Sequence, residues 1–275
     1  MPERALVLAG GGVAGIAWEL GMIDGLRGAG VDLGAPDLIL GTSAGSVVGA
    51  QLATGQLDAA IAMQERAATT EIAAQLDIAQ LLAKGAEIAR AAPEATDAGR
   101  RWGVYALAAR TVPEAPRRAA VAARLPVQTW PAQPLGITAV DAATGELVVF
   151  DRGSGVSLVD AVTASCAVPG VWPPATIGER RYLDGGIRSF ANADLARGHH
   201  RVLVLAPIAV TDAWHRARFD AELATLERVL VVEGDPDSAA AIGTNPLDPA
   251  RRKPALDAGR QQARRVVDQV RTFWA

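Results

Sequence analysis

The hydrophobic pattern at the start of the chain repeats one short arrangement twice. An apolar run at 5–9 passes through three glycines at 10–12 into a helical pattern over about 14–27. A second apolar run, at 38–40, passes through a glycine-flanked turn into a helical pattern that ends near Thr54. Two consecutive strand–turn–helix units are typical of a parallel sheet covered by helices. We therefore expect a three-layer α/β/α fold with a mainly parallel central sheet, in which these two strands are parallel neighbours.

The remaining pattern predicts a helical insertion followed by further strands and helices. From about 58 to 124 the chain is alanine-rich and helical, is interrupted by prolines and a glycine, and contains no convincing strand. The other predicted elements are strands at 135–140 and 146–150 that form a hairpin, a capped helix at 157–166, a buried strand at 201–206, and C-terminal helices within about 214–273 (214–231 and 254–273). A chain of 275 residues that is 50% hydrophobic can bury one large core. We expect a single domain over 1–275.

Charge and cysteine content narrow the function classes. The net charge is −3 and the 27 basic residues are dispersed, so the sequence lacks the basic tract that nucleic-acid binding requires. Cys166 is the only cysteine, which excludes an intrachain disulfide and suits a reducing compartment. No apolar run approaches the roughly 20 residues of a membrane span. We expect a cytoplasmic protein without metal or cofactor, whose contact with membranes is peripheral and transient. The amphipathic segment 260–274 is expected to be a packed surface helix.

A serine stands in the second turn, in the sequence Gly41-Thr-Ser-Ala-Gly45. The G-x-S-x-G pattern between a strand and a helix is typical of a nucleophile elbow, in which a sharp turn exposes the serine hydroxyl at the end of the sheet. Ser43 is therefore the candidate nucleophile. The motif by itself is weak evidence, because the chain contains 28 glycines.

The first glycine turn, at 10–15, has three interpretations. It satisfies G-x-G-x-x-G, and Asp32 lies at the distance where a dinucleotide-binding protein places its ribose-binding acid. That acid should end a strand, whereas the residues around Asp32 read as a loop. A purely structural turn is the second interpretation. In the third, which we favour, the amides of Gly11, Gly12 and Val13 at a helix N-terminus form an oxyanion hole.

A serine nucleophile needs a base, and the sequence offers two kinds. His199, His200 and His215 stand in polar, arginine-rich surroundings that are typical of surface histidines. Asp184 follows a short apolar segment and precedes two glycines, so its carboxylate can project from a tight loop at a strand end. Two alternatives stay open: a conventional α/β-hydrolase triad with a histidine base, and a non-catalytic nucleotide-binding protein that uses the first glycine turn.

Taken together, four segments resemble the patatin-like phospholipases in order and spacing. They are the glycine triplet, residues 41–45, the block Ala164-Ser-Cys-Ala-Val-Pro-Gly-Val-Trp-Pro-Pro174, and Asp184-Gly-Gly. The resemblance covers about residues 5–54 and 135–206. It implies a patatin-like fold and a lipid acyl hydrolase or esterase in which Asp184 acts directly on Ser43 through an acyl-enzyme. The glycines that it implies as motif support are Gly10, Gly15, Gly41, Gly45, Gly185 and Gly186.

The chain departs from that family at two places. Ala14 stands where many members have Arg or Lys, so a cation near the oxyanion is missing. The Asn-x-Pro that often follows Asp-Gly-Gly is absent, and Asn192 is the residue expected to supply support from a shifted position. We further expect the helical insertion to cover the acyl chain, with apolar walls from Trp18, Val168, Val171 and Trp172.

Overall fold

The central feature of the molecule is a single sheet of eight strands among the residues that the structure, a computed structural model, describes: 3–66, 71–92 and 94–275. The strands are β1 (Arg4–Leu8), β2 (Leu38–Gly41), β3 (Leu135–Asp141), β4 (Leu147–Phe150), β5 (Ala175–Ile177), β6 (Arg180–Asp184), β7 (Arg201–Ala206) and β8 (Val229–Glu233). Their order is β5-β6-β3-β2-β1-β7-β8, with β4 paired to β3. The predicted parallel pairing of β1 with β2 and the β3–β4 hairpin are both confirmed.

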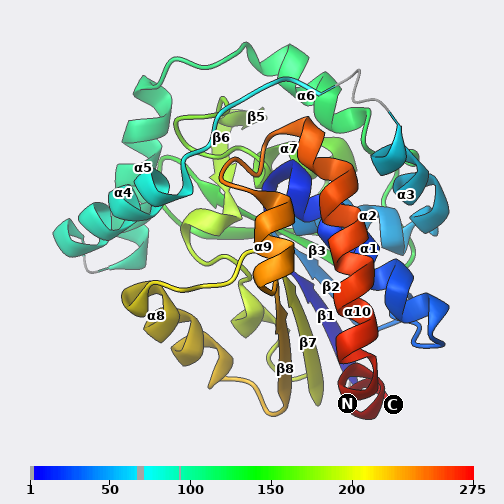
Figure 1. Cartoon of the computed structure of the whole chain (residues 1–275). Helices are drawn as coiled ribbons and strands as arrows, with labels where there is room; N and C mark the ends of the chain where they lie inside the picture. The colour runs from blue at the N-terminus through cyan, green and yellow to red at the C-terminus, as the bar shows by residue number, and fades with distance from the viewer. Residues whose placement is uncertain (1–2, 67–70, 93) are drawn as a thin grey trace.

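Helices cover both faces of this sheet (Figure 1). They are α1 (Gly12–Gly28), α2 (Ala44–Ala53), α3 (Leu57–Glu65), α4 (Ile78–Ala91), α5 (Ala95–Ala108), α6 (Glu114–Ala122), α7 (Leu158–Ser165), α8 (Ala213–Leu223), α9 (Pro236–Ile242) and α10 (Arg252–Trp274), with 3₁₀ turns η1 (Gly185–Ile187), η2 (Ala193–Ala196) and η3 (Pro249–Arg251).

The alternation of side chains along β1 divides the core into two layers. Leu6 and Leu8 belong to the cluster formed with α1, α2, α7 and α10. Ala5 and Val7 point to the other face, where they pack in a cluster with η2 and with Phe219 of α8. Because neighbouring residues of a strand face opposite sides, one short apolar run supplies both cores. The three-layer α/β/α prediction is confirmed.

The predicted insertion is helical in the part of it that the structure describes. Helices α3 to α6 span 57–122, and no described residue in this range belongs to a strand. Ile88 of α4 and Trp102 of α5 pack against Val140 of β3 and Leu183 of β6. Helices α4 and α5 therefore lie against the half of the sheet that contains β3 and β6, whereas α3 packs on α1 and α10 and lies on the other side of the molecule in Figure 1.

The C-terminal region differs from the prediction in one element. The predicted helix at 214–231 is wrong at its end: α8 stops at Leu223, and Val229–Glu233 forms β8, which pairs in parallel with β7. The Val-Leu-Val-Val run favours a strand, and β7 offers it a free edge. Helix α9, which was not predicted, follows with Asp235 as N-cap and Pro236 in its first turn.

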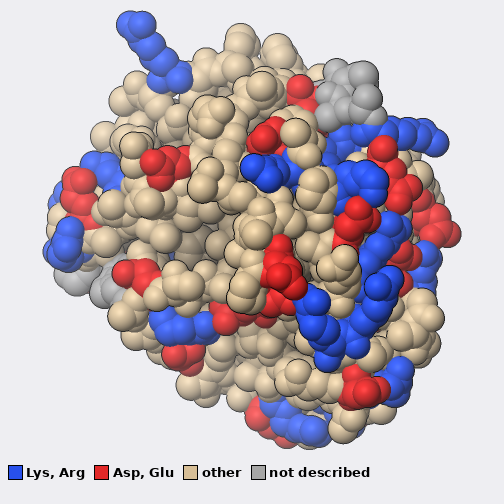
Figure 2. Space-filling model, in the orientation of Figure 1, with Lys and Arg blue, Asp and Glu red and all other residues tan. Residues whose placement is uncertain are grey.

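Helix α10 is a packed surface helix, as predicted. It buries Leu256, Ala263, Val270 and Trp274 in the main core. Its outer face mixes charges of both signs, and Figure 2 shows blue and red side chains interspersed over it; Arg265, for example, pairs with Asp235. Within the described ranges, no helix combines the length and the apolar character needed to cross a membrane.

Candidate active site

Ser43 stands at a strained turn between β2 and α2. Its φ is 53° and its ψ is −112°, a backbone conformation that non-glycine residues rarely adopt. The turn is so tight that a Cβ on Gly45 would lie 2.0 Å from the carbonyl oxygen of Leu8, and one on Gly41 would lie 2.5 Å from the carbonyl oxygen of Gly45. The two glycines of the motif are therefore required by backbone contact. This geometry is that of a nucleophile elbow.

Residues from α2 and from the C-terminal end of α7 hold the backbone of the turn in place. The amide of Ser43 donates a hydrogen bond to Oγ of Ser165 (2.9 Å). The carbonyl of Ser43 accepts from Oγ of Ser46 (2.6 Å) and from the thiol of Cys166 (3.3 Å). Two residues at the start of the 164–174 block thus support the serine.

Strand β3 brings Asp184 to the serine. Ile137 of β3 pairs with both Gly41 of β2 and Phe150 of β4, and Ala139 pairs with both Asp184 of β6 and Val148 of β4. Since β4 occupies one edge of β3, β2 and β6 must share the other edge, where they meet end to end. The carboxylate at the end of β6 therefore lies beside the turn that follows β2.

Burial dominates the chemistry of Asp184, whose exposed fraction is 4%. Its Oδ1 accepts a hydrogen bond from the Gly186 amide (2.8 Å), while Oδ2 completes no hydrogen bond with a described residue. Burial raises the pKa of Asp184 to about 7, although the Ser43 hydroxyl, the Gly186 amide and the charge of Arg117 each lower it. The hydroxyl is thus near the carboxyl without a tight hydrogen bond, as is common in free enzymes. A carboxyl of this pKa can accept a proton at neutral pH.

Asn192 lies between the serine turn and the Asp184 loop. It has a left-handed backbone (φ 53°) and is fully buried. Its Nδ2 donates to Oγ1 of Thr42 (3.1 Å) and to the carbonyl of Gly185 (3.2 Å). The residue expected to give support from a shifted position therefore connects the two segments.

The first glycine turn opens α1 beside the serine. Helix α1 begins at Gly12, whose φ is +64°. The amides of Gly11, Gly12 and Val13 donate no hydrogen bond to any described residue, whereas those of Gly10 and Ala14 on either side are bonded to carbonyls of Phe190 and Pro246. Three unpaired amides at a helix N-terminus provide an arrangement suited to an anion.

These segments meet in one pocket with a volume of about 90 Å³. The predicted site residues that line it are Gly10, Gly11, Gly12, Val13, Ser43, Asp184 and Gly186. The other motif glycines lie behind it: Gly15 against Pro207 and Ala44, Gly41 and Gly45 within the turn, and Gly185 against Thr138. The structure thus brings the three motifs together.

Two of the four residues predicted as apolar walls line the pocket of Ser43, and a third lines a neighbouring pocket. Val168 and Trp172 line the pocket of Ser43, and Val171 lines the neighbouring one. The expectation for Trp18 is wrong. Its side chain is fully buried in the core on the α9 side of α1, where Nε1 donates to Oγ of Ser238 (2.9 Å).

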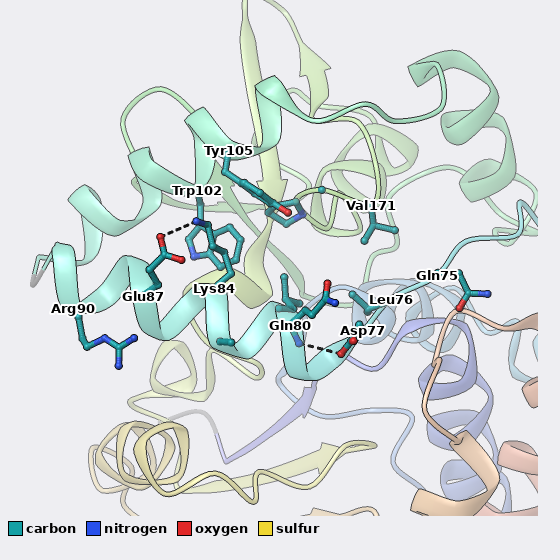
Figure 3. Close-up of a pocket in the computed structure, with 14 residues that line it drawn as sticks. Gln75, Leu76, Asp77, Gln80, Lys84, Glu87, Arg90, Trp102, Tyr105 and Val171 are labelled. Carbon is teal, nitrogen blue, oxygen red and sulfur yellow. Dashed lines mark hydrogen bonds and ion pairs between the residues drawn. The ribbon is translucent and has the colours of Figure 1, made fainter.

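The neighbouring pocket, of about 590 Å³, lies between α4, α5 and the 169–171 loop (Figure 3). Leu76, Leu81 and Pro169 line both pockets, so the two adjoin. Figure 3 shows Lys84 and Tyr105 at its wall, where Lys84 Nζ lies 5.6 Å from the Tyr105 ring centroid. The narrow pocket of Ser43 thus adjoins a wider space between helices α4 and α5 of the insertion and the 169–171 loop.

Residues of the insertion and of the C-terminal half that no sequence pattern indicated also line the pocket of Ser43. They are Ile78, Leu81 and Leu82 of α4, Arg117 of α6, and Arg124, Phe190, Ile208, Pro246 and Leu247. Nothing in a helical pattern distinguishes Arg117 from the other basic residues. The proximity arises only from the packing of α6 onto α7.

The histidines and Asp32 lie away from this pocket. His199 and His200 precede β7, which runs parallel to β1 and, through it, to β2. They therefore stand at the N-terminal end of the parallel strands, whereas Ser43 follows the C-terminal end. Asp32 precedes β2 and lies at the same end as the histidines. His215, on α8, has its Nδ1 2.8 Å from Oδ1 of Asp212 and does not line the pocket.

Within the described part of the chain, no three His, Cys, Asp or Glu side chains are grouped as ligands for an ion.

A family model described as patatin-like phospholipase matches residues 6–197, a range that contains all four motif segments. Two uncharacterised NTE family proteins, of Mycobacterium tuberculosis and Mycobacterium bovis, are 33% identical over 186 residues, which is 68% of this chain and 43% of each relative. The chain thus spans less than half the length of these relatives.

Two solved structures align with 98% of the chain. VipD from Legionella pneumophila does so over 67% of its own chain, at 15% identity and a TM-score of 0.49. The type III effector protein ExoU does so over 53% of its own chain, at 19% identity and a TM-score of 0.45.

Proposed function

Because the chain belongs to the patatin-like phospholipase family, we propose that it is a serine esterase that cleaves carboxylic ester bonds of lipids through a dyad of Ser43 and Asp184. One observation carries the proposal. A serine on a strained turn shares a pocket with a buried carboxyl whose pKa is about 7 and with three unpaired helix-terminal amides. Nucleophile, base and oxyanion donors are what acyl transfer requires.

In the first half of the reaction, Oγ of Ser43 attacks the ester carbonyl carbon and Asp184 accepts the hydroxyl proton. The carbonyl oxygen becomes an oxyanion, which the amides of Gly11, Gly12 and Val13 stabilise. Each such donor contributes about 3 kcal/mol to lowering the barrier. The C–O bond to the alcohol then breaks, Asp184 returns the proton to the leaving alkoxide, and an acyl-Ser43 ester remains.

In the second half, water attacks the acyl-enzyme. Asp184 takes a proton from the water as its oxygen bonds to the acyl carbon, and the same amides hold the second oxyanion. Collapse of this intermediate breaks the bond to Ser43, whose oxygen recovers the proton from Asp184. The products are one alcohol and one carboxylic acid, and no other reactant is consumed.

The position of the histidines favours the dyad over a triad. His199 and His200 lie at the opposite end of the sheet from Ser43, so neither can reach its proton without a rearrangement of β7. The nucleotide-binding alternative is disfavoured by Asp32, which stands at that same opposite end. We propose that the enzyme acts in the cytoplasm and meets its lipid substrate at a membrane surface.

The test compares point variants on a panel of p-nitrophenyl esters of graded chain length and on labelling by an organophosphonate. Ser43→Ala should abolish both hydrolysis and labelling. Asp184→Asn should lower kcat/KM by roughly a thousandfold or more, and the double variant should be scarcely worse, because the two residues act as one unit.

His199→Ala and His200→Ala are the matched controls, and each should keep activity within about tenfold of wild type. If either histidine variant matched the loss of Ser43→Ala while remaining folded, the triad would replace the dyad. If Ser43→Ala kept its activity, the proposed function would be lost.

A further inference from the structure

Arg117 is a buried cation in the pocket of Ser43 that the reaction above does not use. It lies on α6 of the helical insertion, and its exposed fraction is 3%. It lines the same pocket as Ser43 and Asp184, and its charge lowers the pKa of Asp184. Its guanidinium carbon is 3.9 Å from the centroid of the Trp172 ring, so the stacking fixes the plane of the group beside the pocket.

This guanidinium has no acceptor among the described residues. Nε and Nη1 of Arg117 are buried and form no hydrogen bond with a described residue, and no carboxylate in the described part of the chain lies within ion-pair distance of the group. A carboxylate is near, but Glu71 pairs instead with Arg124, whose Nε donates to it at 3.0 Å. Proteins rarely bury a charge without a partner, because its lost hydration costs several kcal/mol. An acceptor supplied by a ligand would satisfy it.

The pocket keeps an excess of positive charge at neutral pH. Burial lowers the pKa of Arg117 to about 10, which leaves it protonated. Arg117 and Arg124 both line the pocket, while Glu71 neutralises one of them and Asp184, with a pKa of about 7, is only partly ionised. The charge balance therefore favours an anionic ligand.

We propose that Arg117, on the helical insertion, is the residue that binds a phosphate group of the substrate, so that any preference for phosphate-bearing over neutral lipid esters depends on this one side chain. The inference rests on the proposed esterase function and names the residue that sets its substrate preference. The guanidinium fork matches a phosphate with two parallel hydrogen bonds. The oxyanion of the reaction already has three unpaired amides at the start of α1, which leaves Arg117 for a second anionic group. Ala14 supplies no cation from that loop, and α6 supplies one from the insertion.

The experiment uses two short-chain esters with the same acyl group, 1-hexanoylglycerol and 1-hexanoylglycerol-3-phosphate, as soluble monomers. Wild type should show the higher kcat/KM on the phosphorylated ester. Arg117→Gln should lower kcat/KM on that ester by about 10- to 100-fold, the usual effect of losing hydrogen bonds to a charged group. Both esters are assayed at about pH 9, where Asp184 is ionised with or without the charge of Arg117 and where Arg117 itself stays protonated. Under this condition Arg117→Gln should leave the neutral ester within about threefold, and Arg117→Lys should recover part of the preference because it keeps the charge.

Arg118→Gln is the matched control, because Arg118 is the next residue of α6 and pairs with Asp160 at the surface. It should change neither ester. Thermal unfolding of each variant shows whether the stacking on Trp172 is needed for folding. A binding measurement on Ser43→Ala, by calorimetry with hexyl phosphate, gives a readout without turnover, and adding Arg117→Gln should abolish that binding.

Three outcomes would overturn the proposal. The first is an equal loss on both esters, which would place Arg117 at the oxyanion or in a structural role. The second is a wild type without preference for the phosphorylated ester. The third is displacement of hexyl phosphate by inorganic phosphate at equal concentration, which would make the free anion the ligand. In each case, hydrolysis of the neutral ester by wild type but not by Ser43→Ala would still support the proposed function.

Discussion

The serine end of the sheet and the helical insertion that covers it are built in different ways. At the serine end, the backbone itself forms the site: Gly45 touches the carbonyl of Leu8, and the amides of 11–13 open α1. In the insertion, side chains form the site, with Leu81 of α4 and Arg117 of α6 projecting into the pocket. Backbone contacts tolerate almost no substitution, whereas side chains on a helix can be exchanged singly. The comparison suggests that the sheet fixes the reaction and the insertion selects the substrate.

Glycine-to-alanine variants in the two regions provide the strongest test of this contrast. In Gly45→Ala the new methyl would meet the Leu8 carbonyl at 2.0 Å, and a backbone atom cannot move aside. We expect a loss of about 3 kcal/mol or more of stability and loss of hydrolysis. The measurements are urea unfolding and ester turnover.

Gly85→Ala in α4 is the counterpart from the insertion. Its methyl would lie 3.6 Å from Trp102 Cζ2, an ordinary contact. Alanine is the better helix former, so we expect stability to stay equal or to rise by about 0.5–1 kcal/mol. A harmful Gly85→Ala together with a harmless Gly45→Ala would reverse the contrast.

The pH profile of kcat/KM tests the role of Asp184 at the serine end, and its expected effect is smaller than that of Gly45→Ala. Asp184 must be ionised to act as base, and burial places its pKa at about 7. We expect kcat/KM on a neutral ester to be level above about pH 7 and to fall roughly tenfold per pH unit below it. A profile that stayed level down to about pH 5, near the usual pKa of a carboxyl, would contradict the burial argument.

The same carboxyl links stability to pH with a definite sign. Its pKa is raised above the unfolded value of about 4, so the folded state loses stability as pH rises from about 4 to about 7. Asp184→Asn should therefore be more stable than wild type at pH 8, and the gap should narrow toward pH 4. Thermal unfolding at the two pH values measures it, and an Asp184→Asn protein that is less stable at pH 8 would oppose the argument.

The smallest expected effect concerns Glu19. Like Arg117 it is a buried group without a hydrogen-bond partner among the described residues, but no ligand is proposed for it. Glu19 of α1 is fully buried, neither of its oxygens forms a hydrogen bond with a described residue, and it does not line the pocket of Ser43. Burial raises its pKa well above the usual value, and the nearby amide of Ala9 offsets only part of this. We expect Glu19→Met to raise stability by roughly 1 kcal/mol near neutral pH, because an apolar group of similar shape removes an unsatisfied one.

The pH dependence of this stability gain shows whether the buried carboxyl of Glu19 causes it. Since the raised pKa of Glu19 reduces stability as pH rises above about 4, the gain from Glu19→Met should shrink toward pH 4. Hexyl phosphate should raise the unfolding temperature of wild type through Arg117 and have the same effect in Glu19→Met. A Glu19→Met protein that is less stable than wild type at every pH would assign Glu19 a structural role.

The sequence predicted the half of the fold that local patterns control. The strands at 5–9 and 38–40 and the hairpin at 135–150 are apolar runs bounded by turn residues, and all formed as expected. The predicted helix at 214–231 wrongly includes residues 229–231 of β8, because a short apolar run after a helical pattern has no periodicity that separates helix from strand. Pairing with β7, far away in the sequence, decides it.

For the candidate site, the sequence by itself determined the chemistry that is encoded in short motifs. Gly41, Ser43 and Gly45 set the turn through contacts within a few residues and with the adjacent strand, and Gly12 of the glycine triplet supplies the positive φ at the start of α1. Only the tertiary structure decided which distant groups join them. The pairing of β2 and β6 on one edge of β3 places Asp184 beside Ser43, and burial then raises its pKa. The packing of α6 onto α7 brings Arg117 to the pocket, while Trp18 packs in the main core, where its Nε1 donates to Oγ of Ser238. Pairing register and desolvation depend on residues far apart in the chain, and no single stretch of sequence contains them.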